Sequence, residues 1–231
     1  MFAPMVLLAL LPPAEPNEAE KLFRQMEEKV LKAKTLECVV EGTVEGTAKG
    51  VKLGMKATVL AGAHNQVRMD LTGEAEGKTE KLSIISDGMK VMTVEKEPAP
   101  AQYASKWLGE SVRAAVARSG VTVPFILIRL APDKTREFKV DEYLPISDFK
   151  LGKKETVGKH EAQVVEYTLT LKTEKSPPPI AVQVWIDTKS HVPLKRVLTG
   201  EKGKDTVTIT ETYTKVEIDG KIDLKMFELP K

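Results

Sequence analysis

Apolar residues recur along the chain at two different periods, and the first of them is helical. From Ala19 to Ala33 they return every three or four positions among Lys, Glu and Arg, which is the spacing of one helix face. Asn17 can cap the first amides of this helix, and Glu20 stands where a capping-box acid is expected. We therefore predict an amphipathic helix of about four turns that ends near Lys34.

Alternation with a period of two replaces this pattern between residues 36 and 96. Five alternating runs are separated by turns rich in Gly, Asn and Asp, such as Asp87-Gly88, a dipeptide typical of two-residue hairpins. The runs predict five antiparallel strands in a meander, each with one apolar and one polar face. The strand carboxylates are then expected on the solvated face, and Arg68, between Val67 and Met69, is expected to point outward.

Two further helices are predicted in the middle of the chain. Ala101–Arg118 carries apolar residues on one side and is followed by Gly120, a residue that favours helix termination. Thr122 can cap a third, short helix with Pro124 in its first turn, and residues 125–131 are apolar nearly all round, which is typical of a buried helix. About five more alternating strands follow between Phe149 and Val216.

The order helix, five strands, two helices, five strands contains no linker-like segment. We predict an α+β, mainly β fold in which a single curved antiparallel sheet of about ten strands forms an unclosed half-barrel. The N-terminal helix and the two mid-chain helices are expected to cover its concave face. Residues 17–231 are predicted to form one domain.

Residues 1–16 resemble an export signal. Met5–Leu11 is a run of seven apolar residues, the minimum for the core of such a signal, and it is far too short to span a bilayer. No Lys or Arg precedes the run. Either the true start lies upstream, or the run serves another purpose.

Composition argues against several kinds of function. The chain has 35 Lys and Arg against 33 Asp and Glu, a net charge of +2, and 5% aromatic residues. The nearly balanced charge gives no reason to expect a concentrated basic face, and the few aromatic residues argue against base stacking. Nucleic acid is therefore not an expected partner. The single cysteine, Cys38, cannot form an internal disulfide or a Cys-based zinc site, and we predict a buried structural thiol. No metal or other cofactor is expected, because metal-ligand and phosphate-binding motifs are missing from the sequence.

One short segment holds the residue types of a hydrolase triad, namely Asp187, Ser190 and His191. A working triad needs an oriented base and an oxyanion hole. A five-residue turn between two strands supplies neither, and no Gly-x-Ser-x-Gly elbow accompanies it. We predict a hairpin turn set by Asp187 and a protein that is not an enzyme. The other two histidines, His64 and His160, also fall in predicted turns.

The same segment carries a resemblance to a known family. Trp185-Ile-Asp-Thr-Lys-Ser-His-Val-Pro-Leu-Lys-Arg196 resembles the hydrophobic-x-Asp-x-x-x-x-x-Pro-Leu-Lys hairpin of the periplasmic lipoprotein carrier LolA and its relatives. The N-terminal helix leading into a strand, the mid-chain helices and the terminal Met226-Phe-Glu-Leu-Pro230 agree with it. The superfamily also includes an outer-membrane lipoprotein receptor, a lipid-sensing regulator of an envelope-stress anti-sigma factor, and uncharacterised exported proteins. The carrier's lipoprotein-gripping arginine cannot be placed on a position here, and no cysteine follows the signal to carry the receptor's lipid anchor.

The resemblance implies a periplasmic or otherwise exported monomer, without a transmembrane span, that binds a lipid or the acyl chain of a lipoprotein in its apolar concave face. An alternative is a signalling or scaffold protein of the same fold that binds another envelope protein through its helices or a sheet edge. Methionines on such a face either adapt to a ligand or fill a core. Whether the helices leave the cavity open is not decided by the sequence. The candidate cavity residues are Val40, Val44, Leu53, Met55, Val59, Val67, Met69, Leu71, Phe125, Ile128, Tyr167, Leu169 and Val184.

Overall fold

A computed structural model describes residues 16–46, 51–75, 77–125, 139–172, 177–203 and 205–230. Its first helix, α1 (Glu18–Leu31), begins after Asn17, whose side chain accepts a hydrogen bond from the backbone N–H of Glu20 at 2.9 Å. The predicted helix and its cap are therefore confirmed. The buried face of α1, which includes Phe23 and Met26, follows the predicted apolar spacing.

A single antiparallel sheet of eleven strands dominates the described part of the chain, and it consists of two meanders. The first comprises β1 (Leu36–Gly46), β2 (Val51–Ala61), β3 (Gln66–Ala75), β4 (Lys78–Asp87), β5 (Lys90–Val94) and β6 (Gln102–Tyr103). The second comprises β7 (Ile146–Val157), β8 (His160–Leu169), β9 (Ile180–Asp187), β10 (Pro193–Lys202) and β11 (Asp205–Ile218). The strand order is β6-β5-β4-β3-β2-β1-β11-β10-β9-β8-β7, so β6 and β7 are the outermost strands of the described sheet. The predicted unclosed, mainly β half-barrel is confirmed.

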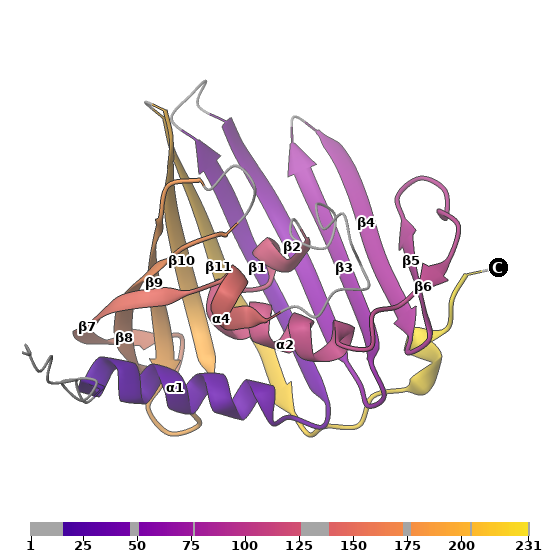
Figure 1. Ribbon diagram of the computed structural model, residues 1–231. Helices are drawn as coiled ribbons and strands as arrows, with labels where there is room; N and C mark the ends of the chain where they lie inside the picture. Colours follow the sequence, from indigo (N-terminus) through magenta and orange to yellow (C-terminus); the bar gives the residue numbers. More distant parts are fainter. Residues whose placement is uncertain are drawn as a thin grey trace, which may run out of the picture.

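The first and the last strand pair with each other in the middle of the sheet (Figure 1). β1 and β11 run antiparallel along the whole of β1, from Leu36 opposite Ile218 to Gly46 opposite Val207. The register shifts once, between Val39 and Val40, where a β-bulge increases the local twist. This central ladder joins two meanders, each built from neighbouring strands, into one curved sheet.

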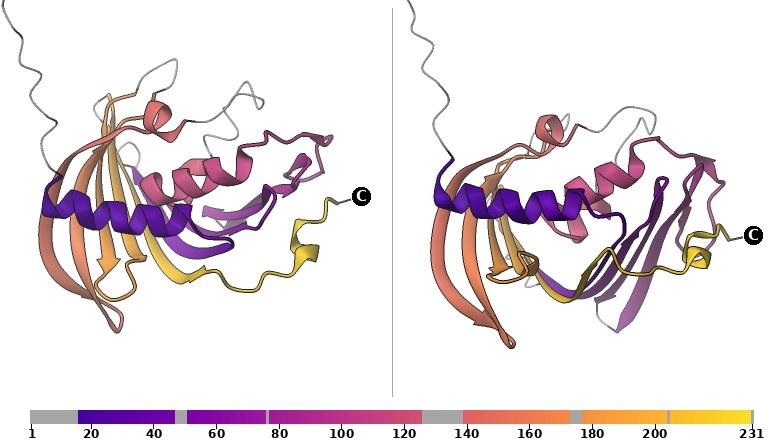
Figure 2. Two further views of the ribbon diagram at one scale, coloured as in Figure 1. Left: turned by 60° about the horizontal axis from the view of Figure 1, so that its bottom comes forward. Right: turned by 90° about the horizontal axis from the view of Figure 1, so that it is seen from below.

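Helices α1 and α2 (Leu108–Ser119) lie on the concave side of this sheet (Figure 2). α1 packs against β7, β8 and α2, and α2 also packs against β2 and β3. One apolar cluster forms between α2 and β1–β5, and a second forms between α1 and β7–β10. The concave face is thus covered by helices, as predicted.

The remaining helical segments are short. Helix α4 (Val140–Tyr143) contacts α2, and the 3-10 helix η2 (Leu224–Phe227) packs against β3 and β4. Residues 122–125 of the third predicted helix are helical, whereas its residues 126–131 lie outside the described residues. Among the helices that the structure describes, none combines the length and the apolar character needed to cross a membrane.

The second predicted helix begins later than expected. Residues 102–103 form β6 beside β5, and α2 starts only at Leu108. The residue before the helix, Trp107, makes no side-chain capping hydrogen bond. The cap comes instead from the β2–β3 turn, where the Asn65 side chain accepts the backbone N–H of Gly109 at 2.6 Å. Local periodicity cannot reveal a cap that comes from a distant part of the chain. The residues before the helix form β6, which is the eleventh strand of the sheet.

We expect Gly120→Ala to destabilise the fold more than Gly158→Ala. Both glycines have a positive φ, of 82° and 60°, which strains a side chain by about 1–2 kcal/mol in the left-handed region. The strain is larger at Gly120, because its ψ of −168° puts it in a region that only glycine readily adopts. At Gly120 a Cβ would also lie 2.2 Å from Oε2 of Glu211, whereas no described atom lies within 4 Å of that position at Gly158. Displacing the hydrogen bonds of Glu211 should add about 1–3 kcal/mol to the loss in urea unfolding. Equal losses for the two variants would contradict this close packing.

Candidate functional site

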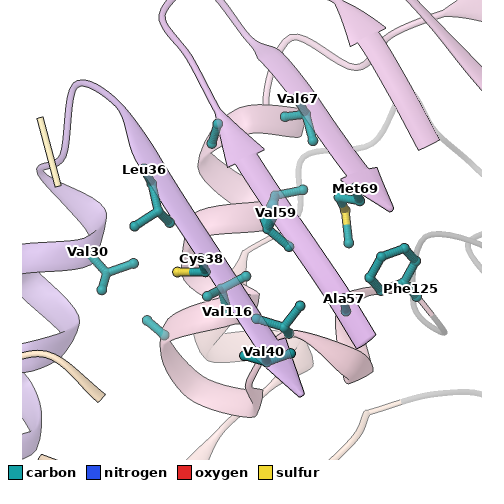
Figure 3. Packing of buried hydrophobic residues seen from close by; sticks show 14 of the residues in the cluster. Val30, Leu36, Cys38, Val40, Ala57, Val59, Val67, Met69, Val116 and Phe125 are labelled. Atoms are coloured by element: carbon teal, nitrogen blue, oxygen red, sulfur yellow. The ribbon is translucent and has the colours of Figure 1, made fainter. Parts of the chain in front are cut away.

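Helix α2 fills the part of the predicted cavity that lies over β1–β5. The predicted residues buried in the cluster beneath it are Val40, Val59, Val67, Met69 and Phe125 (Figure 3). Met55 is 8% exposed, and its sulfur accepts a hydrogen bond from the hydroxyl of Thr122 at 3.2 Å. These side chains therefore pack against protein atoms.

The other predicted residues lie in two further places. Those buried in the cluster beneath α1 are Tyr167, Leu169 and Val184. Those only partly buried are Val44, Leu53 and Leu71, of which Leu71 packs on the margin of the first cluster. Ile128 lies outside the described residues.

An apolar groove of about 450 Å³ lies on the same concave face, beyond the end of α2. Its walls come from the segment after α2, from the connection between β8 and β9, and from β9–β11. The lining residues are Val123, Leu171, Pro177, Pro178, Ile180, Leu198, Gly200, Glu201, Gly203, Val207 and Ile209. Glu201 is the one charged residue in this set. The volume falls within the range of about 300–1,000 Å³ that is typical of small-molecule sites.

The strand register explains why this part of the concave face is hollow. Leu198 on β10 stands opposite Ile209 on β11, and the next inward pair is Gly200 opposite Val207. Gly200 contributes no side chain, and a Cβ there would meet, among the described atoms, only Ile180 at 3.7 Å. The pair of Gly200 and Val207 therefore leaves a gap between these two strands and the segment after α2 that contains Val123.

Two buried charged residues lie directly below the groove. Arg196 on β10 and Glu211 on β11 stand opposite each other, two residues from the groove lining on each strand, and both are 0% exposed. The guanidinium of Arg196 donates from Nη1 to the carbonyl of Val116 and from Nη2 to that of Ala117, each at 2.8 Å. These carbonyls belong to the last turn of α2, and that of Val116 also accepts the backbone N–H of Gly120 at 3.1 Å.

Glu211 holds the chain just after the same helix. Its carboxylate accepts the backbone N–H of Val121 at 3.0 Å and that of Thr122 at 2.7 Å. Val123, the next residue, lines the groove. We call Arg196 and Glu211 the clasp, because together they fix the end of α2 and the floor of the groove.

The surroundings of Arg196 favour its charged form. Burial acts to lower the pKa of Arg196, but nearby acidic groups, Glu211 among them, raise it above its ordinary value. Burial raises the pKa of Tyr167 to about 12 and that of Tyr213 well above its usual range, so both hydroxyls remain donors. Tyr213 donates to Glu211 at 3.1 Å, and Tyr167 donates to the carbonyl of Arg118 at 2.5 Å.

Glu211 corrects the expectation that strand carboxylates face solvent. The inward positions at this end of β11 are Val207, Ile209, Glu211 and Tyr213. One carboxylate therefore interrupts an otherwise apolar face, and this interruption is the signal from which a buried acid could have been predicted. Arg68 does lie outward, as predicted, and pairs with Asp70 at 2.7 Å.

The Asp-Thr-Lys-Ser-His segment forms the predicted hairpin turn between β9 and β10. Oδ1 of Asp187 accepts the backbone N–H groups of Lys189 at 2.9 Å and Ser190 at 2.6 Å, and Oδ2 contacts Nδ1 of His160 at 2.8 Å. The backbone N–H of His191 donates to the carbonyl of Asp187 at 3.0 Å. Asp187 therefore organises the turn.

Metal-ligating and redox-active side chains do not converge in the described part of the chain. No three His, Cys, Asp or Glu residues there are placed to hold a metal ion. Cys38 is buried as predicted, and burial raises its pKa to about 12. A thiol with such a pKa is a poor nucleophile.

No family model and no curated protein matches the sequence. Solved structures similar to the chain include LprF from Mycobacterium bovis, with 10% identity and a TM-score of 0.48 over 89% of this chain and 98% of that one. A LolA superfamily protein from Nitrosomonas europaea has 10% identity and a TM-score of 0.38 over 93% and 99% of the two chains. The MucA/MucB complex of Pseudomonas aeruginosa has 13% identity and a TM-score of 0.42 over 93% of this chain and 62% of that one. The LolA superfamily is thus among the structural neighbours.

We expect Arg196→Met to destabilise the protein by about 3–5 kcal/mol, because it removes the hydrogen bonds to the carbonyls of Val116 and Ala117 and also the buried positive charge near the carboxylate of Glu211. Lys56→Met is the matched control. Lys56 pairs with Glu41 at 3.1 Å and both side chains are exposed, and such pairs contribute about 0–1 kcal/mol. Urea unfolding followed by tryptophan fluorescence measures both variants. A loss at Arg196 as small as that at Lys56 would show that the clasp does not hold the fold together.

Asp187 should make stability depend on pH in the acid range. Burial acts to raise its pKa, but hydrogen bonds from Ser190, Lys189 and His160 lower it from 3.8 to about 2. Because the folded pKa is the lower one, the stabilisation is fully present above about pH 4 and is lost as the pH falls through about 2. The stability difference between the wild type and Asp187→Asn should therefore be largest above pH 4 and shrink toward pH 2. Urea unfolding across this range is the measurement, and a difference that stays constant would contradict the expectation.

Proposed function

We propose that this chain is a non-enzymatic binding protein of the cell envelope that holds the acyl chain of a lipid or lipoprotein in the groove above the clasp. The groove itself carries the proposal, because its lining is apolar apart from Glu201. Acyl chains have no polar atoms to satisfy, and each methylene they bury contributes about 0.8 kcal/mol. An apolar groove with a charged residue in its lining suits a ligand with a long tail and a polar head.

The groove occupies a smaller part of the concave face than the sequence-based cavity. In this proposal the residues beneath α1 and α2 support the site from below, and the ligand contacts the walls formed by β9–β11. Val44 borders this region, because it stands opposite Ile209 across the central ladder, and Leu53 stands opposite Val44. A longer ligand would extend toward these two half-buried side chains.

The proposal includes an exported protein that acts as a monomer. Residues 1–16 serve in it as the export signal and residues 17–231 as a single binding domain. Residues 1–15 lie outside the described residues, so amino-terminal sequencing of the protein recovered from the periplasm tests this part separately. A mature chain that begins near Pro16 is the expected result.

Native mass spectrometry of the purified protein, followed by solvent extraction and lipid analysis, tests the binding function. One acyl lipid per chain is the expected result. An apo mass together with no uptake of an added fluorescent fatty acid would contradict the proposal. A stoichiometric protein partner without any lipid would instead favour the scaffold function that the sequence left open.

Val207→Glu should weaken uptake of a fluorescent fatty acid at least about tenfold, which corresponds to about 1.4 kcal/mol. The new carboxylate would stand inside the apolar groove, where a buried charge is costly, and Val207 is only half-buried, so the fold should tolerate it. Val39→Glu is the control, because Val39 is a half-buried valine between the inward-facing Cys38 and Val40 and so lies on the other face of the sheet. Equal affinities for the two variants would remove the groove as the binding site.

A further inference from the structure

We propose that Gly200 determines how far an acyl chain enters the groove, and that the chain lies along β10 and β11 with its tail toward the clasp. This inference rests on the proposed function and deepens it, because it assigns the length selectivity of the site to one residue. It follows from the direction of the groove, from the place of Gly200 within it, and from the absence of a backbone requirement for glycine there.

The groove runs along the strands from a buried end to an exposed end. Leu198, next to the clasp, is 2% exposed, Gly200 is half-buried, and Glu201 and Gly203 at the β10–β11 turn are exposed. The turn between β10 and β11 lies at the upper end of these two strands in Figure 1. Residues 198–203 span roughly 17 Å at about 3.3 Å per residue. A tail therefore enters from the turn and stops at the floor formed by Val123 and the clasp.

Gly200 stands between these two ends and faces inward. It is two residues from Leu198 and three from Gly203, and it lies opposite Val207. Any side chain placed there would project into the groove between floor and rim. Such a side chain would divide the groove into an outer part near the β10–β11 turn, which an acyl chain could still enter, and an inner part near Leu198, which it could not reach.

The backbone does not require glycine at this position. Gly200 has no left-handed φ, in contrast to Gly120, and a Cβ would lie at an ordinary contact distance of 3.7 Å from Ile180. Glycine in a strand interior weakens the strand, and it often marks a place where a ligand approaches the backbone closely. The space left by the missing side chain is thus available to a ligand.

The test is a displacement assay with a fluorescent fatty acid and unlabelled fatty acids of eight to eighteen carbons. Wild type, Gly200→Ala, Gly200→Val and Gly200→Leu are compared. Gly54→Leu is the control, because Gly54 alternates with the inward-facing Met55 on β2 and, among the described atoms, only the Cβ of Glu74 lies near its own Cβ position, at 3.9 Å. The preferred chain should shorten stepwise with side-chain size. Gly200→Leu should lose at least about tenfold in affinity for the longest chains, and its affinity for the shortest should stay within about threefold.

The possible outcomes separate this inference from the proposed function. A wild type that binds no fatty acid of any length overturns the proposed function and this inference with it. A wild type that binds, with Gly200 variants that lose all lengths equally or lose none, overturns only the length selectivity. Thermal unfolding of each variant identifies those that fold, and Gly200→Ala, the smallest change, keeps the comparison decisive if the leucine variant does not fold.

Discussion

The arrangement of the concave face depends on the hydrogen bonds by which the clasp, Arg196 and Glu211, holds the end of α2 to the sheet. A helix of twelve residues, the length of α2, is marginal on its own in water. Here its start is capped by Asn65 and its end is held by hydrogen bonds to the clasp. Since both ends are bonded to the sheet or its turns, α2 is a fixed part of the core. The hollow region begins where this support ends.

A buried ion pair of Arg118 and Glu27, with the exposed Asp141 as a further partner of Arg118, extends this support outward from α2. Arg118, in the last turn of α2, donates from Nε to Glu27 of α1 at 2.5 Å, from Nη1 to the carbonyl of Leu144 at 3.1 Å and from Nη2 to Asp141 of α4 at 2.6 Å. Arg118 therefore bonds α2 to both α1 and α4, and the clasp bonds α2 to the sheet. Buried charges are costly without partners, so these groups favour one packing of the helices over other apolar packings.

Features set by neighbouring residues were predictable from the sequence, and features set by distant residues were not. α1, its Asn17 cap and most strand positions follow from local periodicity, and the Asp187 turn follows from the chemistry of aspartate at a strand end. The start of α2 depends on Asn65, over forty residues away in the chain. For the candidate cavity residues on strands, alternation along the sequence gives the face of the strand but not what packs on it. Only the helices, by filling one part of the concavity, determine where a groove is left.

The central position of the β1–β11 ladder has a consequence for how the protein is made. β1 is complete at Gly46, but its partner extends to Ile218, so the two halves of the sheet cannot join until almost the whole chain has been synthesised. Until then β1 presents a long strand edge whose backbone groups are unpaired, and such edges pair readily with other chains. The edge of β1 that faces β11 in the folded sheet is therefore open to such pairing for longer than any edge within either meander.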